Sequence, residues 1–144
     1  MIVIGPGLNS GIGHHANKYT NVFPNSEYYI FGSQLPEVDH ALIFMLPIKP
    51  HLEYLKYVRT RVKNLACMTV CETETVHEEY GLIMKEFKKV AVPSEFCKRV
   101  LSNQFPENEF YIIHAHIPKP REKPYTFYHI GNIMDPRKKS QDVL

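Results

Sequence analysis

The sequence predicts an α/β fold in which a parallel sheet carries helices on both faces. Short β-branched and aromatic runs alternate along the chain with helix-forming stretches, which is the pattern of parallel sheets. The first of these runs, residues 1–4, leads directly into a segment with four glycines within nine residues. The chain has 144 residues, of which 44% are apolar and 22% charged, so it can bury a core without a metal or disulfide. The expected arrangement is Rossmann-like.

Each element has its own local signal. Pro50 is well placed in the first turn of a helix, and apolar residues then recur every three to four positions up to Val62. Ser94 is expected to cap a later helix, with Glu95 favourable to its dipole. Strands are predicted at residues 1–4, 28–31, 40–46, 65–71, 90–92 and 110–113, and helices at 11–19, after Pro50, at 78–86 and after Ser94.

The charge and proline patterns predict a domain boundary near the end of the chain. Residues 118–124 contain three prolines and four charged residues, a composition typical of a stiff linker. The last 28 residues carry six basic and three acidic side chains, against a net charge of +2 for the whole chain. We therefore expect a domain at 1–117, a linker at 118–124, and the start of a truncated second domain at 125–144.

Composition excludes several classes of protein. A net charge of +2 is far from the basic stripe of nucleic-acid-binding proteins, so no nucleic-acid partner is expected. The apolar runs are much shorter than the roughly 18 residues of a membrane span, and no transmembrane segment is predicted. Three cysteines without a C-x-x-C spacing indicate reduced, structural thiols in a cytoplasmic protein.

The glycine-rich segment 5–13 is the first candidate binding site. A strand, a glycine loop and a helix in succession offer backbone N–H groups to an anion or a sugar hydroxyl. The alternative is a tight strand-to-helix turn that binds nothing. The string also resembles the Gly-x-x-x-Gly-Ile-Gly of short-chain dehydrogenases, but no Tyr-x-x-x-Lys follows, and Gly32-Ser33-Gln34 stands where an acidic residue would hold the ribose. An NAD(P)-dependent dehydrogenase is therefore the third alternative.

Residues 72–79 form the second candidate site, because four carboxylates and an imidazole follow a predicted strand. Glu72, expected at the strand's end, is the candidate acid, base or charge stabiliser, whereas Glu78 and Glu79 are better explained as an acidic helix start. His114, His116 and the pair His14-His15 suggest a metal site only weakly, because no further ligand has a telling spacing. No metal or other cofactor is predicted.

Four segments together resemble the GT-B glycosyltransferases of family 4, the group 1 transferases that use nucleotide-sugar donors. The matching segments are Gly11-Ile12-Gly13-His14, Met68-Thr69-Val70-Cys71-Glu72-Thr73, Val92-Pro93-Ser94-Glu95-Phe96, and Tyr128-His129-Ile130-Gly131-Asn132 with Asp135-Pro136-Arg137-Lys138. The resemblance implies two Rossmann-like domains with the active site between them. The present chain would hold the acceptor-side domain and the beginning of the donor-binding domain.

The resemblance also implies roles for individual residues. Glu72 would be catalytic, Arg137 and Lys138 would contact the donor diphosphate, and the substrate-binding residues would be Gly11, Ile12, Gly13, His14 and Thr73. The reaction would be metal-independent sugar transfer, with retention, to a glycan, lipid or protein acceptor. Asn132 replaces the family's usual Arg, and the missing C-terminal donor domain would leave these 144 residues inactive alone. The alternative to the glycosyltransferase hypothesis is a non-catalytic sugar- or nucleotide-binding module, or a half-enzyme.

Overall fold

The computed structural model describes residues 1–114 and confirms the predicted fold class. Six strands form one parallel sheet in the order β2-β1-β3-β4-β5-β6. The expected linker 118–124 and the segment 125–144, with Arg137 and Lys138, lie outside the described residues. The strands are β1 (Ile2–Gly5), β2 (Glu27–Ile30), β3 (Val38–Phe44), β4 (Val62–Met68), β5 (Lys89–Val92) and β6 (Glu109–Ile112).

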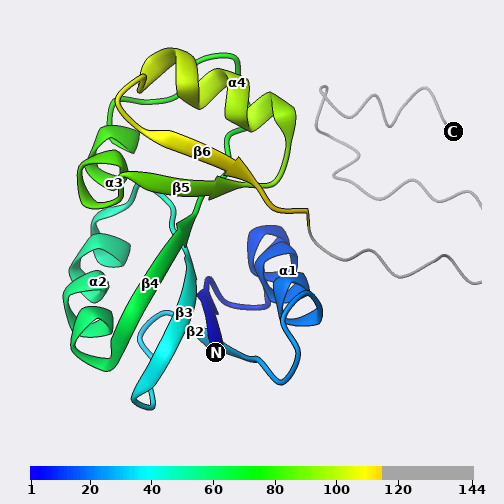
Figure 1. Cartoon of the computed structure of the whole chain (residues 1–144), viewed down its shortest axis with the longest axis vertical. Coiled ribbons are helices and arrows are strands. Elements are labelled where there is room, and N and C mark those ends of the chain that lie inside the picture. The colour runs from blue at the N-terminus through cyan, green and yellow to red at the C-terminus, as the bar shows by residue number, and fades with distance from the viewer. Residues whose placement is uncertain (115–144) are drawn as a thin grey trace, which may run out of the picture.

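Helices cover both faces of the sheet, but unequally. One face packs against α2 (Lys49–Arg61), α3 (Tyr80–Glu86) and α4 (Glu95–Gln104), and this side holds the larger core cluster. The opposite face carries α1 (Gly11–Asn17) and the 3₁₀ helix η1 (Lys18–Asn21), which pack over Val3, Leu42, Phe44 and Met68. Figure 1 shows α1 on one side of the strands and α2 and α3 on the other.

The order of the strands creates a switch point beside β1. The chain passes from β1 through α1 to β2 on one side, whereas β3 pairs with the other side of β1 and the sheet then grows away from it. In open parallel sheets, ligands bind outside the carboxyl ends of the strands at such a point. The loops after β1, β3 and β4 are therefore the first places to look for a site.

The β4 strand lies three residues earlier than its predicted range of 65–71. Val62 is both the residue that ends α2 and the first residue of β4, so no loop separates the two elements. Lys63 and Asn64 are exposed and polar, and this composition disguised the start of the strand. As a result, Glu72 lies four residues beyond the last strand residue, Met68, rather than directly at its end.

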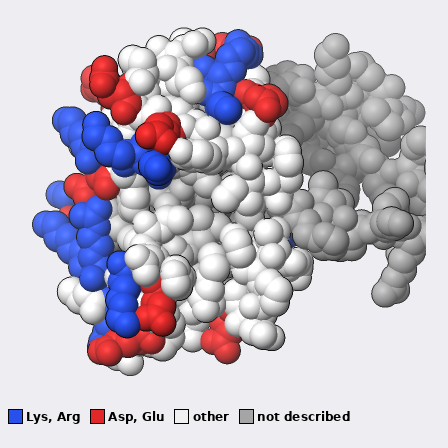
Figure 2. All heavy atoms as spheres, viewed as in Figure 1, with Lys and Arg blue, Asp and Glu red and all other residues white. Residues whose placement is uncertain are grey.

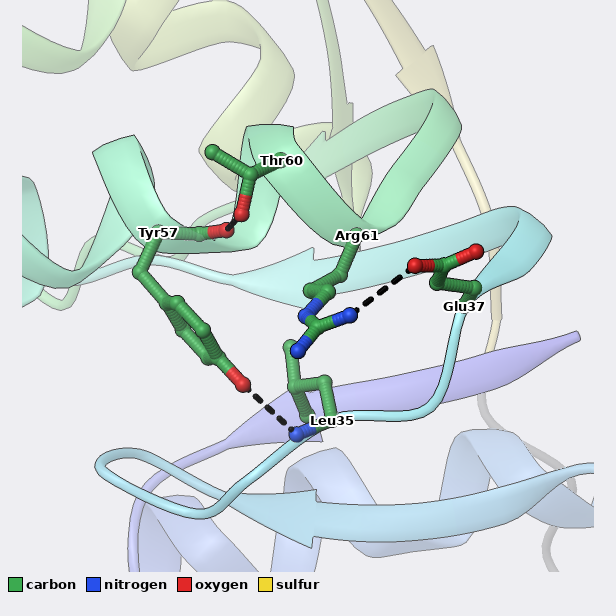
Figure 3. Close-up of polar contacts among 5 residues, drawn as sticks. All are labelled: Leu35, Glu37, Tyr57, Thr60 and Arg61. Atoms are coloured by element: carbon green, nitrogen blue, oxygen red, sulfur yellow. Dashed lines mark hydrogen bonds and ion pairs between the residues drawn. The ribbon is translucent and has the colours of Figure 1, made fainter.

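The amino-terminal edge of the sheet contains a hollow of about 900 Å³. Its lining includes Arg61, whose guanidinium lies 2.9 Å from the Glu37 carboxylate. Figure 3 shows this ion pair. In the same view the Tyr57 hydroxyl accepts a hydrogen bond of 3.1 Å from the backbone N–H of Leu35. Exposed ion pairs of this kind stabilise a fold little. The hollow lies opposite the strand ends where ligands of parallel sheets bind.

No helix within residues 1–114 is long and apolar enough to cross a membrane. The charged side chains of the described surface are unevenly spread. Figure 2 shows Lys and Arg gathered with carboxylates on the side formed by α2 and α3, and few charged groups on the side that carries α1. The α2–α3 side includes Lys49, Lys56, Arg59 and Lys85.

Candidate functional site

The loop after β1 is held in one conformation by its own side chains. Ser10 caps α1, because its hydroxyl accepts a 3.0 Å hydrogen bond from the backbone N–H of Gly13. The same hydroxyl donates to the carbonyl of Gly7 at 2.9 Å. From β2, the hydroxyl of Tyr28 donates to the carbonyl of Pro6 at 2.6 Å. Three contacts therefore fix the path of the chain between the strand and the helix.

Gly13 lets the helix approach this loop more closely than any other residue would. A Cβ atom at this position would lie 2.0 Å from the carbonyl oxygen of Gly7 and 2.8 Å from that of Pro6. Both contacts are to backbone, which cannot rotate away as a side chain can. At Gly11, by contrast, an added Cβ would meet nothing within 4 Å. The sequence grouped both glycines in one motif, but of the two only Gly13 is required by packing against backbone.

The predicted substrate-binding residues of α1 are only partly accessible. Gly11 and His14 are exposed, Ile12 is half-buried against the core, and Gly13 is buried. The backbone N–H groups of Gly13 and His14 are used by Ser10, while those of Gly11 and Ile12 make no hydrogen bond to the described residues. Two adjacent N–H groups at the start of α1 therefore remain available to a ligand's oxygen atoms.

His15, which the sequence suggested only as a weak metal ligand, instead packs its ring against the core. Its ring lies edge-on to Tyr19 at 5.6 Å and to Phe44 at 5.9 Å between centroids. Its Nε2 atom is buried and makes no hydrogen bond to the described residues. Burial, aided by the charge of Lys18, lowers the pKa of the imidazole and keeps it neutral. The inward orientation of His15 could have been predicted, because Ile12, His15, Ala16 and Tyr19 are spaced so that they share one face of a helix.

The loop after β4 begins inside the core and then turns outward. The backbone N–H of Thr69 donates to Ala91 at 3.1 Å, and its buried hydroxyl donates to the carbonyl of Met45 at 2.8 Å. Glu72 and Thr73 are both exposed, and the Thr73 hydroxyl donates to the carbonyl of Thr75. The carboxylate of Glu72 is thus available to a ligand at the carboxyl edge of the sheet.

The glycine loop and the Glu72 loop lie at the same edge of the sheet but follow strands that are not neighbours. They follow β1 and β4, and β3 runs between these strands. With neighbouring strands about 4.8 Å apart, the two strand ends are roughly 10 Å from each other. Within residues 1–114, no hydrogen bond or ion pair joins the two loops. The two loops are therefore separate elements of this edge, with the chain that follows β3 between them.

His51, a buried histidine in the first turn of α2, binds the loop that follows β3. The Nδ1 atom of His51 accepts a 3.2 Å hydrogen bond from the backbone N–H of Leu46. The ring stacks on Phe31, with 3.7 Å between centroids. Burial lowers the pKa of His51 below the ordinary value of 6.5. A proton on Nδ1 would remove its acceptor role, so the neutral ring is part of the loop's structure.

We expect the protein to lose stability when the pH falls below about 6.5, the pKa of histidine in an unfolded chain. His15 and His51 both have lowered folded-state pKa values, so the unfolded chain binds more protons in this range and the free energy of unfolding declines. Each histidine contributes at most about 1.4 kcal/mol per pH unit. Urea unfolding of wild type and His51→Gln between pH 8 and pH 5 measures this, and equal pH slopes would contradict the assignment to His51.

Metal ligands do not cluster in the part of the chain that the structure describes: no group of three or more His, Cys, Asp or Glu residues could hold an ion there. The ring of His114 is exposed and its Nδ1 lies 3.1 Å from the carbonyl of Pro93. His14 is also exposed, on α1. His116 falls outside the described residues. Of the histidines that suggested a metal, His15 packs against the core and His114 contacts a backbone carbonyl.

Comparison with protein-family models, curated proteins and solved structures gives no significant match for this chain.

Proposed function

We propose that this chain is the acceptor-side domain of a GT-B-type glycosyltransferase that transfers a sugar from a nucleotide-sugar donor. One observation carries the proposal: the glycine loop and the exposed Glu72 carboxylate lie at the same carboxyl edge, one strand apart, beside the switch point of the sheet. The four motif segments that resemble family 4 support it. The proposed donor is a nucleotide sugar, and the proposed acceptor is a glycan, lipid or protein.

The described residues divide the proposed work between two loops. The unused N–H groups of Gly11 and Ile12 would bind oxygen atoms of a substrate, while His14 and Thr73 would contact hydroxyl groups at the rim. Glu72 would stabilise positive charge that develops on the sugar as the leaving diphosphate departs. Arg137 and Lys138 would neutralise that diphosphate. The proposed enzyme would work in the cytoplasm, where free thiols such as those of Cys67, Cys71 and Cys97 stay reduced.

The test is an assay of the protein as its source produces it, with a panel of nucleotide sugars and with glycan, lipid and peptide acceptors. The expected result is release of a nucleoside diphosphate together with an acceptor whose mass has increased by one sugar. Stoichiometric binding of an acceptor without cleavage of any donor would instead establish a non-catalytic binding module. Binding and reduction of a nicotinamide cofactor would replace the proposal with a dehydrogenase.

Two substitutions test the roles of individual residues in an active form. Glu72→Gln is expected to lower kcat by at least about tenfold, equal to about 1.4 kcal/mol of transition-state stabilisation. Lys138→Ala is expected to lower turnover strongly, because positive charge is most useful where negative charge develops. The neighbouring variants Glu78→Gln and Lys139→Ala are the matched controls. Turnover that falls equally in each variant and its control would remove Glu72 and Lys138 from the proposed site.

A further inference from the structure

Two of the three cysteines, which are 26 residues apart in the sequence, come together beside the Glu72 loop. Cys71 follows β4, and Cys97 lies in the first turn of α4. The Cys97 thiol lies 3.4 Å from the carbonyl oxygen of Cys71, to which it donates a hydrogen bond. Cys67, the third cysteine, is buried within β4 and its thiol contacts the carbonyl of Met68 instead.

Contacts from Gln104 and Arg99 hold the loop after β4 against α4. From α4, the side-chain amide of Gln104 accepts a 2.7 Å hydrogen bond from the N–H of Val76 and donates to its carbonyl at 3.1 Å. The guanidinium of Arg99, also on α4, lies 3.1 Å from the Glu74 carboxylate. These contacts attach the loop after β4 to α4 at two points beyond the cysteines. The fold therefore keeps the backbone of Cys71 and the side chain of Cys97 next to each other.

The pair is shielded but lies next to solvent. Cys71 is 6% exposed and Cys97 4%, whereas residues 72–75, which follow Cys71 directly, are all exposed. Tyr80 packs nearby and its hydroxyl donates to the carbonyl of Val70 at 2.6 Å. Burial is the main cause that raises the pKa of Cys71 to about 12, so this thiol is protonated in the resting protein. Cys67 is only 1% exposed, so the pair lies slightly nearer to solvent than the third cysteine.

We infer that Cys71 and Cys97 form a reversible intrachain disulfide when the protein meets a small peroxide, and that this bond locks the Glu72 loop onto α4. Bond formation does not depend on the proposed function, although any effect on sugar transfer would rest on it. The contact of one sulfur atom with the other residue's carbonyl is compatible with a disulfide, whose Cα atoms lie about 4.4–6.8 Å apart.

The chemistry balances with hydrogen peroxide as the oxidant. Cys97, near the positive end of the α4 dipole, attacks one peroxide oxygen; the O–O bond breaks, the Cys97 thiol proton passes to the departing hydroxide, and a sulfenic acid and one water form. The Cys71 sulfur then attacks the sulfenic sulfur, the S–O bond breaks, and a second water leaves with the thiol proton. Two thiols are oxidised by two electrons in all, and one peroxide is reduced to two waters. A dithiol reductant reverses the reaction.

The experiment oxidises the reduced, intact chain with hydrogen peroxide, blocks the remaining thiols with iodoacetamide under denaturing conditions, and measures the mass. The expected product carries one alkylated cysteine, and its mass is 2 Da below that of a reduced chain with one alkylated cysteine, because the disulfide has lost two hydrogens. Peptide mapping is expected to find Cys71 joined to Cys97. Closing a loop of this length raises Tm by roughly 5–10 °C. Mapping uses the wild-type protein, so it does not depend on whether a variant folds.

Cys67→Ser is the matched control, because it removes a buried thiol of the same sheet without touching the pair. It is expected to form the same cross-link, whereas Cys71→Ser and Cys97→Ser are expected to form none. Three alkylated cysteines after peroxide treatment, a cross-link that includes Cys67, or a mass gain of sulfinic acid without a cross-link would each overturn the inference.

Discussion

Replacing Gly13 with alanine is expected to destabilise the protein by about 3 kcal/mol, the upper range for forcing an extra methyl group into a packed site. The added Cβ would lie 2.0 Å from the backbone oxygen of Gly7, so either α1 or the loop must move. Movement of the loop would also break the hydrogen bonds of Ser10 that cap the helix. Urea unfolding followed by circular dichroism measures the change.

Gly11→Ala is the control for this substitution, because its Cβ meets no atom within 4 Å and alanine favours the helix. Its free energy of unfolding is expected to stay the same or rise by up to about 1 kcal/mol. If both variants were equally stable, close packing would not explain Gly13. Because both glycines belong to the proposed binding loop, this comparison also separates a structural requirement from a functional one.

Tyr19→Ala is expected to cost about 3–5 kcal/mol, the range for removal of a buried aromatic side chain. Tyr19 is fully buried, packs on Phe44, and donates its hydroxyl to the carbonyl of Ile113 at 2.9 Å. Tyr19→Phe keeps the ring and loses only the hydrogen bond, so its expected cost is about 1–2 kcal/mol. Thermal unfolding of both variants separates the two contributions.

Tyr111→Ala is the matched control, because Tyr111 is 49% exposed on β6 and its removal leaves no cavity. Its expected effect is within about 0.5 kcal/mol. A Tyr19→Ala variant as stable as this control would show that the α1 side of the sheet is not the packed layer described above. The comparison thus tests the smaller of the two core clusters, which underlies the candidate site.

Elements with a strong local signal could be predicted from the sequence. The alternation of short strands and helices predicted the parallel sheet, and Ser94 caps α4 as expected, with its hydroxyl accepting from the N–H of Cys97 at 3.2 Å. The start of β4 could not be predicted well, because at Val62 one residue ends a helix and begins a strand. Only the packing of the complete sheet decides where such a boundary falls.

The position of the candidate residues relative to the sheet was predictable, whereas their individual contacts were not, and their role in a site stays a prediction. Glycines and carboxylates that follow strands were expected at the carboxyl edge of the sheet, since parallel strands end together, and the loops after β1 and β4 lie at that edge. The inward orientation of His15 and the pairing of Cys71 with Cys97 depend on tertiary contacts between distant segments. The sequence likewise gives no distance between the loops after β1 and β4, because that distance depends on β3 being placed between them.

The bond between Tyr19 and Ile113 has a consequence for the order of events on the ribosome. The two residues are separated by 94 positions, so at synthesis rates of about 5–20 residues per second the hydroxyl waits roughly 5–19 s for its partner. During that interval the apolar face of α1 has no complete sheet to cover. The nascent chain therefore exposes part of this apolar surface until the later strands are made, and slower translation of the second half would lengthen that exposure.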